Sequence, residues 1–139
     1  MKLTQNFTLE EMTVSATAKR LKIQNEPSIT EIMKLQKLCS EVLQPIRDKF
    51  KKPIVVTSGY RCPKLNAAVG GVRTSQHLLG EAADISVGGK YQNKQLFELI
   101  FQMIINKEIQ VGQLIDEYDY RWLHISLPYK KINQVLHIR

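Results

Sequence analysis

The chain has 139 residues, of which 43% are hydrophobic and 24% are charged, which is ordinary for a globular protein of one domain. No run approaches the roughly 18 consecutive apolar residues of a membrane span, so we expect no spanning helix. The net charge of +7 favours polyanionic surroundings such as an acidic cell-wall polymer. The cations are scattered and no DNA-binding motif is present, so no specific nucleic-acid partner is expected.

The N-terminus contains no apolar stretch of the kind that a secretory signal needs. We therefore expect synthesis in the cytoplasm, with any action on a cell wall following release or another export route. Cys39 and Cys62 lack metal-type spacing and are too few for a disulfide framework, which favours a reduced compartment. Residues 1–139 are predicted to form a single domain, with an N-terminal arm at 1–27 and a C-terminal tail at 128–139.

Two capping boxes mark the helix starts in the first half of the chain. A box at 8–11 predicts a short helix, and a second box at 28–31 begins a longer one. Apolar residues recur at helical spacing from 29 to about 50. Pro45 lies inside this helix, where its missing N–H is expected to kink the last turns. The β-branched run at 53–58 then predicts a strand.

A long polar segment follows the first predicted strand. Residues 59–66 are rich in turn formers and predict a loop. The chain then reads Ser-Gln-His-Leu-Leu-Gly-Glu-Ala-Ala-Asp from Ser75 to Asp84. Gly80 favours a turn, and residues 82–87 have the pattern of a strand. This segment is therefore interpreted as a loop, a turn and a strand, not as a continuous helix.

The last third of the chain predicts one helix and two strands. An amphipathic helix is expected over 94–107, and strands at 113–118 and 121–127 are expected to form a hairpin. The tail after them has no strong pattern, and His137 within it is interpreted as a surface residue. Together the elements predict an α+β fold, with helices packed on a small, mostly antiparallel sheet.

Two histidines and one aspartate in these segments suit a metal site in a cleft. His77 and Asp84 are seven residues apart, and a turn at Gly80 would fold the histidine back beside the carboxylate. His124, on a neighbouring strand, would complete the set. Two imidazoles and one carboxylate with an open fourth position suit a single zinc ion of a hydrolytic centre, whereas Mg²⁺ and Ca²⁺ prefer oxygen ligands.

The same motifs resemble those of the M15 peptidases. The resemblance rests on Ser-Gly-Tyr-Arg at 58–61, Asn66, the segment 75–85 and Trp-Leu-His-Ile-Ser at 122–126, and it spans about residues 7–127. The family contains zinc D-Ala-D-Ala carboxypeptidases and phage endolysins, and it shares its metal site with the Hedgehog signalling domain. The resemblance implies that the zinc ligands are His77, Asp84 and His124.

The resemblance also implies residues that contact the substrate. Arg61, after the Ser-Gly-Tyr motif, would hold a substrate carboxylate or carbonyl, since a guanidinium suits either group. The alternative is that Arg61 braces its own loop. Ser75 and Gln76 would lie nearby, either contacting substrate or supporting the metal ligands.

The catalytic base is the point where this sequence departs from the family pattern. Many M15 enzymes carry an acid three residues before the last histidine, but this chain has Arg121 there. The acidic candidates are Asp116, Glu117 and Asp119. In the similar, shorter-chain family members a glutamate ends this strand, which favours Glu117 as the base and leaves Asp119 as the second choice. Glu117 as an ordinary solvated strand residue remains the alternative.

These features predict a monomeric zinc peptidase that acts on peptidoglycan stem peptides, either as a carboxypeptidase or as an endopeptidase. The missing acid at Arg121 keeps a second hypothesis open, which is a catalytically inactive binding module stabilised by zinc. Such a module would bind a cell wall or a protein and would hydrolyse nothing.

Overall fold

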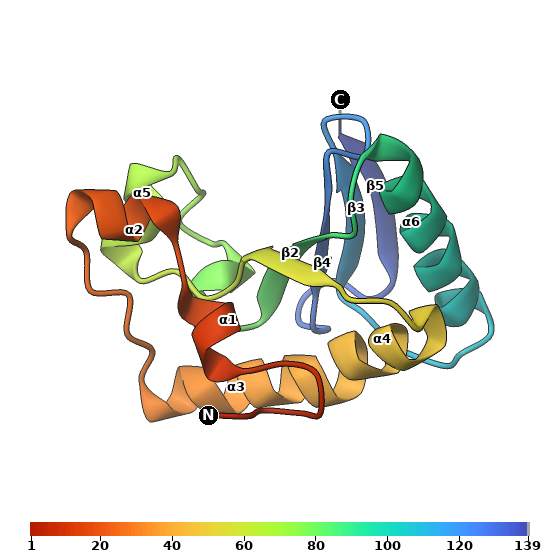
Figure 1. Cartoon of the computed structure of the whole chain (residues 1–139), viewed down its shortest axis with the longest axis horizontal. Helices are drawn as coiled ribbons and strands as arrows, with labels where there is room; N and C mark the ends of the chain where they lie inside the picture. The colour runs from red at the N-terminus through yellow and green to blue at the C-terminus, as the bar shows by residue number, and fades with distance from the viewer. Residues whose placement is uncertain (139) are drawn as a thin grey trace.

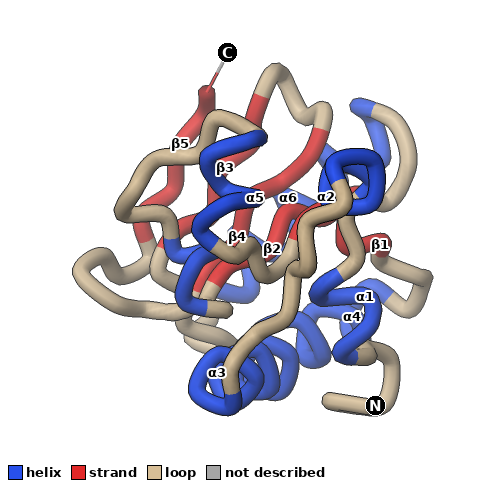
Figure 2. Tube along the Cα trace, turned by 90° about the vertical axis from the view of Figure 1, so that its left-hand side faces the viewer, coloured by secondary structure: helices blue, strands red, loops and turns tan. Residues whose placement is uncertain are grey.

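The computed structural model describes residues 1–138, with five strands and a set of mostly short helices (Figures 1 and 2). The helices are α1 (Leu9–Thr13), α2 (Ala16–Leu21), α3 (Ile29–Leu38), the π-helix η1 (Cys39–Leu43), α4 (Gln44–Phe50), α5 (Pro63–Ala68), the 3₁₀-helix η2 (Gln76–Leu79) and α6 (Lys90–Ile105). The strands are β1 (Val55–Ser58), β2 (Ala82–Ser86), β3 (Gln113–Glu117), β4 (Trp122–Ser126) and β5 (Gln134–Ile138).

The strands form one sheet in the order β1-β2-β4-β3-β5. The pairings of β1 with β2, β2 with β4, and β4 with β3 are antiparallel, whereas β3 and β5 are parallel. The chain reverses after β4 and returns along the far side of β3, so β5 runs in the direction of β3. The predicted α+β class is confirmed, and the sheet is mixed instead of mostly antiparallel.

The helix predicted over 29–50 forms, with a local change of geometry near Pro45. It runs as α3, η1 and α4, and the amide of Gln44 donates to the carbonyl of Cys39, five residues back. Pro45 has no amide to donate and crowds the preceding turn, so a wide π-turn at this place relieves the conflict. The predicted kink therefore takes the form of a π-helical segment.

The two faces of the sheet have different roles because strand residues alternate between them. One face packs on α6 and on the helical segment α3–η1–α4. Its fully buried residues are Ala83, Ile85, Leu114, Leu123 and Ile125. The other face carries the polar residues Asp84, Gln113, Glu117 and His124, which border a cleft. The hydrophobic core thus fixes the strands from one side and leaves the polar residues of the other side grouped together.

Several elements were not predicted by the sequence patterns, among them α2, η2, α5 and β5. The expected loop at 59–66 contains the start of α5, where Pro63 occupies the first turn, a position that tolerates a missing amide hydrogen. The segment treated as a tail, 128–139, contributes β5 to the sheet. None of the helices within residues 1–138 is long and apolar enough to cross a membrane.

Candidate metal centre

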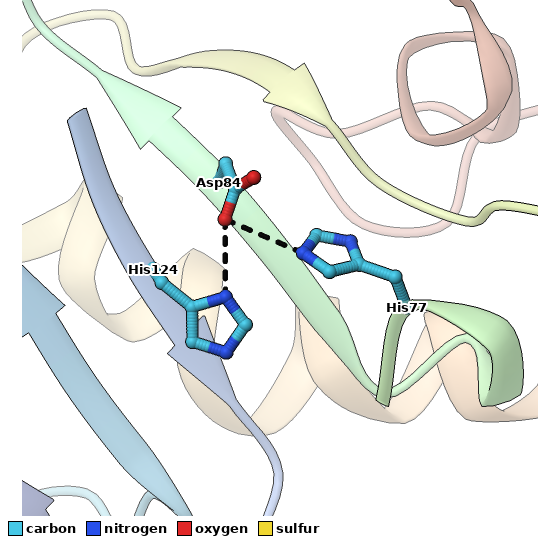
Figure 3. Close-up of side chains that lie close together, drawn as sticks. All are labelled: His77, Asp84 and His124. Carbon is cyan, nitrogen blue, oxygen red and sulfur yellow. Dashed lines mark hydrogen bonds and ion pairs between the residues drawn. The ribbon is translucent and has the colours of Figure 1, made fainter. Parts of the chain in front are cut away.

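The register between β2 and β4 brings Asp84 and His124 together. The two residues are direct partners in the antiparallel pairing, so their side chains leave the sheet on the same face. Nδ1 of His124 lies 3.0 Å from Oδ1 of Asp84. Figure 3 shows both side chains projecting from neighbouring strands toward His77.

His77 reaches this pair from the 3₁₀-helix η2. The hydroxyl of Ser75 caps the helix by accepting from the amide of His77 at 3.2 Å. Gly80 ends the helix with φ of +73°, and a Cβ on it would lie 2.6 Å from the carbonyl oxygen of Glu31. Only glycine permits this left-handed turn so close to α3. The turn returns the chain to β2, and Nε2 of His77 lies 3.3 Å from Oδ1 of Asp84.

A backbone carbonyl fixes the orientation of the His77 ring. Nδ1 of His77 lies 2.7 Å from the carbonyl oxygen of Gly59, which can only accept a hydrogen bond. Nδ1 therefore carries a proton, and Nε2 faces Asp84. A Cβ on Gly59 would lie 2.3 Å from the carbonyl oxygen of Met12, so a glycine is needed where the N-terminal arm crosses this loop.

The three side chains form a group that fits a metal ion. One ligand atom from each of His77, Asp84 and His124 lies within 4.8 Å of the others. The ring of His77 is already oriented with Nε2, the nitrogen that would bind a metal, toward the group. Two imidazoles and one carboxylate that border a cleft match the donor set of hydrolytic zinc sites, which keep one position open.

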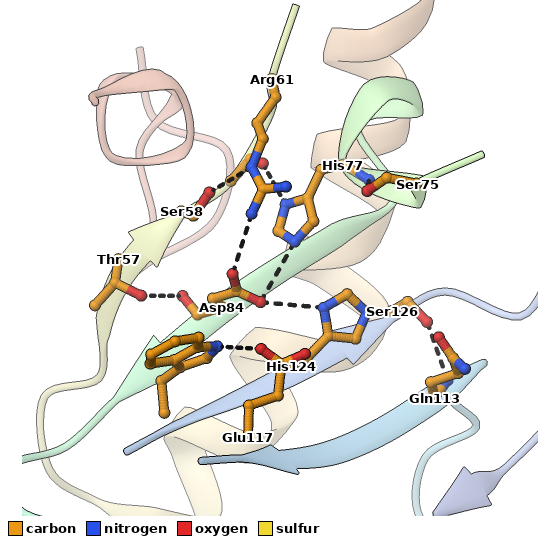
Figure 4. Close-up of polar contacts among 12 residues, drawn as sticks. Thr57, Ser58, Arg61, Ser75, His77, Asp84, Gln113, Glu117, His124 and Ser126 are labelled. Carbon is orange, nitrogen blue, oxygen red and sulfur yellow. Dashed lines mark hydrogen bonds and ion pairs between the residues drawn. The ribbon is translucent and has the colours of Figure 1, made fainter. Parts of the chain in front are cut away.

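Arg61 holds the carboxylate of Asp84 from the other side (Figure 4). Its guanidinium donates to Oδ2 of Asp84 at 3.4 Å, to the hydroxyl of Ser58 at 3.1 Å and to the amide oxygen of Asn66 at 3.3 Å. Burial alone would raise the pKa of Asp84, but hydrogen bonds from His124 and His77 outweigh it and hold the pKa below its usual range. Asp84 is therefore an anion at neutral pH.

The metal-binding group borders a cleft of about 760 Å³ over the polar face of the sheet. Side chains from β2, β3 and β4 form its floor, and the segment from Val69 to His77 forms one wall. Tyr129, Lys130 and Lys131 form another wall. A cavity of this size accommodates a short peptide or a ligand of similar dimensions.

Two of the candidates for the catalytic base, Asp116 and Glu117, lie on opposite faces of the sheet because neighbouring residues of β3 alternate between its faces. Glu117 lies on the cleft side, and its Oε2 accepts from the indole Nε1 of Trp122 at 2.5 Å. Asp116 lies on the opposite face, fully buried, where it accepts from the amide of Tyr120 and pairs with Nδ1 of His137. His137 is half-exposed, as expected of a surface residue, but it also anchors β5 to β3 through this pair.

Asp119 is not brought into the cleft. It lies in the turn between β3 and β4, is half-exposed, and pairs with Lys90 at the start of α6. The structure therefore groups Glu117, but not Asp119, with the three candidate metal ligands.

The protein-family comparison agrees with this geometry. The family described as Peptidase M15 matches residues 5–126. The chain belongs to the M15 peptidase family. No curated protein sequence matches the chain. Membership of the M15 family supports a peptidase-type function, and it confirms the resemblance inferred from the sequence motifs.

The remaining predicted site residues of this M15 chain line the cleft but already have structural contacts. Ser75 caps η2. The side-chain amide of Gln76 donates to the carbonyl of Leu127 at 2.9 Å and to Oε1 of Glu81 at 3.3 Å. Both residues therefore shape the segment that presents His77, and contact with a substrate remains a prediction.

Sequence reasoning missed the side chains that support the predicted residues. Trp122 orients Glu117, and Asn66 orients Arg61; both belong to the quoted motifs, which was the available signal. Tyr129, Lys130 and Lys131 carry no motif at all. Their place in the cleft follows only from the pairing of β5 with β3.

Proposed function

We propose that this M15 peptidase is a zinc-dependent hydrolase that cleaves a peptide bond in bacterial peptidoglycan stem peptides. The observation that carries the proposal is the convergence of His77, Asp84 and His124 beside the cleft that Glu117 also lines. A carboxylate near a two-histidine, one-aspartate centre is the combination that metal-assisted peptide hydrolysis uses.

Each residue has a role that follows from its position. When bound by His77, Asp84 and His124, zinc supplies a Lewis acid that polarises a carbonyl and lowers the pKa of a water. Glu117 accepts a proton from the attacking water and returns it to the leaving amine. Its Oε2 is held by Trp122, which leaves Oε1 for this transfer.

Arg61 both braces its own loop and contacts the substrate, the two roles considered for it from the sequence. Three of its contacts brace the loop and the carboxylate of Asp84. A guanidinium has five N–H donors, so two remain for a substrate carbonyl. The side chain lines the cleft and is 16% exposed, which suits a group that serves both the protein and a ligand.

The proposal covers carboxypeptidase and endopeptidase activity alike, because the cleft is large enough for residues on either side of a scissile bond. It places the activity at the cell wall, which a monomer would reach after release from the cell or by an unrecognised export route. The positive net charge suits an anionic wall polymer.

One observation favours a second candidate function. Arg121 occupies the position three residues before His124, where many family members carry an acid. A chain that kept the metal centre but lost its base would be a zinc-stabilised binding module. Glu117 replaces the missing acid in the first proposal and has no catalytic role in the second.

Mass analysis of muropeptides tests the two proposals directly. Zinc-loaded wild-type protein is incubated with purified peptidoglycan beside Glu117→Gln, Asp119→Asn and the exposed α6 control Glu98→Gln. We expect new peptide termini from wild type, Asp119→Asn and the control, and a loss of about 10²- to 10⁴-fold in rate for Glu117→Gln with zinc retained. Zinc binding with no new termini in any preparation supports the binding module instead.

A further inference from the structure

The segment after β4 forms a wall of the cleft outside the part of the chain that matches the family. The family match ends at residue 126, and Tyr129, Lys130 and Lys131 follow it. These residues line the same cavity as Asp84 and His124. They are exposed at the surface of the loop that connects β4 to β5.

Backbone contacts fix this loop relative to the metal-binding group. At its start, the amide of Leu127 donates to the carbonyl of Glu81 at 2.8 Å. At its end, Asn133 and Val111 exchange two hydrogen bonds, of 2.7 and 2.9 Å. β5 then pairs with β3, which pairs with the strand that carries His124. The wall thus has a defined position although its side chains are exposed.

Within residues 1–138, Lys130 and Lys131 are the cations of the cleft that have no carboxylate partner. Arg61, the third cation that lines it, already contacts Ser58, Asn66 and Asp84. Within residues 1–138, neither Lys130 nor Lys131 forms an ion pair, and Nζ of Lys130 lies 5.8 Å from the ring centroid of Tyr129. Two lysines therefore line the cleft without a carboxylate partner in this part of the chain.

We propose that Lys130 and Lys131 form a subsite that binds a carboxylate of the substrate, an inference that rests on the proposed function. The anionic groups of the cleft, Asp84 and Glu117, belong to the floor, whereas the lysines belong to the loop wall. A peptide with a carboxylate would be drawn with that group toward the wall and its backbone over the metal-binding group. The wall would set which peptides are accepted, while the floor performs the chemistry.

Stem peptides offer this chemistry at two places, the C-terminal carboxylate and the α-carboxylate of a γ-linked D-glutamate. Three probes separate them: the pentapeptide L-Ala-γ-D-Glu-L-Lys-D-Ala-D-Ala, the same peptide amidated at its C-terminus, and the same peptide amidated at the D-glutamate. The amide that weakens binding identifies the carboxylate that the lysines hold.

Equilibrium binding tests the subsite without requiring catalysis. The chain has one tryptophan, and Trp122 contacts Glu117 at the cleft, so its fluorescence reports on occupancy. The zinc-loaded parent carries Glu117→Gln to keep the peptides intact. The test variant adds Lys130→Gln and Lys131→Gln. The control adds Lys51→Gln and Lys52→Gln, an exposed lysine pair outside the cleft that removes the same charge.

We expect the test variant to bind the free pentapeptide about five- to tenfold more weakly than the control, the scale of two solvent-exposed charge pairs. Amidation of the recognised carboxylate should weaken binding to the control and have no further effect on the test variant. Equal affinity of the test variant and the control would overturn the proposal, as would an equal loss for all three peptides. If the wild-type protein cleaves neither these peptides nor purified peptidoglycan while this lysine dependence persists, the proposed function fails and the subsite stands.

Discussion

The metal-binding group and the wall formed by Tyr129, Lys130 and Lys131 border the same cleft but are built in different ways. The side chains of His77, Asp84 and His124 are 3–13% exposed and are held by hydrogen bonds to one another and to the backbone. The wall is fixed through its backbone, and its lysine side chains are exposed. Two of the candidate metal ligands therefore lie on paired strands and His77 lies on a capped 3₁₀-helix, whereas the lysines proposed to bind the substrate lie on a loop.

The difference predicts opposite sensitivities to mutation. Changes near the metal-binding group should weaken metal binding strongly, because each side chain there is oriented by several partners. Changes in the wall should alter peptide preference, changes in the following strand β5 should alter stability, and both should leave metal binding intact. Substitutions in each region test this difference.

The largest effect is expected from removal of a metal ligand. Asp84→Ala and His124→Ala each delete one of three donors, so zinc affinity should fall by more than about 100-fold, beyond the loss typical for supporting residues. Isothermal titration with zinc measures the change. Asp48→Ala, which removes an exposed carboxylate on α4, is the control and should bind zinc like wild type. Retained stoichiometric zinc in either ligand variant would place the site elsewhere.

A smaller loss of zinc affinity is expected from a substitution at Gly59, where the N-terminal arm passes over the loop that supports His77. The Cβ of Gly59→Ala would lie 2.3 Å from the carbonyl oxygen of Met12, so the loop must shift and its carbonyl must leave Nδ1 of His77. Zinc affinity should fall by about 10- to 100-fold, as for other supporting partners of metal ligands. Gly89→Ala, in a looser contact at the start of α6, is the matched control. Unchanged affinity in Gly59→Ala would show that this carbonyl does not orient the ring.

The strand that follows the wall, β5, should respond through stability. His137→Ala removes one partner of the buried carboxylate of Asp116, and the unfolding free energy should fall by about 1–3 kcal/mol. Denaturant unfolding measures the loss. His137→Asn keeps a side-chain donor and should lose less. Zinc affinity of the folded protein should stay that of wild type, and a large drop in it would contradict the separation of the two regions.

The smallest effect concerns Tyr60, at the loop that joins β1 to the metal-binding group. Burial, together with the negative charge of Glu31 and a hydrogen bond to it, raises the pKa of Tyr60 to about 12. Because the folded pKa lies above the unfolded value of about 10, this contribution to stability is complete below pH 10 and is lost as the pH rises toward 12. The unfolding free energy should therefore depend less steeply on pH across this range for Tyr60→Phe than for wild type. An identical pH slope in both proteins would contradict the assignment.

The metal-binding group was predictable from the sequence because its determinants are local. Gly80 requires a turn between His77 and Asp84, and strand alternation places Asp84 and His124 on one face once their strands pair. The same alternation separates Glu117 from Asp116. Residue types and spacing carried this information without knowledge of the full fold.

The rest of the molecule depends on contacts that spacing does not encode. β5 is half-buried along only one edge of the sheet, so its residues show no clear alternation, and its parallel pairing with β3 is a long-range choice. α5 begins at Pro63 in a segment of turn formers that also suits a loop. The pairing of Asp119 with Lys90 joins distant elements, which is why sequence distance to His124 was a poor guide to this residue.

Zinc dependence of peptidoglycan cleavage tests the central claim most directly. Purified peptidoglycan is incubated with the wild-type protein as zinc-loaded, chelator-treated and zinc-restored samples, and new peptide termini are counted by mass spectrometry. We predict cleavage in the loaded sample, its loss after chelation, and its recovery with one zinc ion per chain. Cleavage that continues at the same rate after complete removal of the metal would contradict the account.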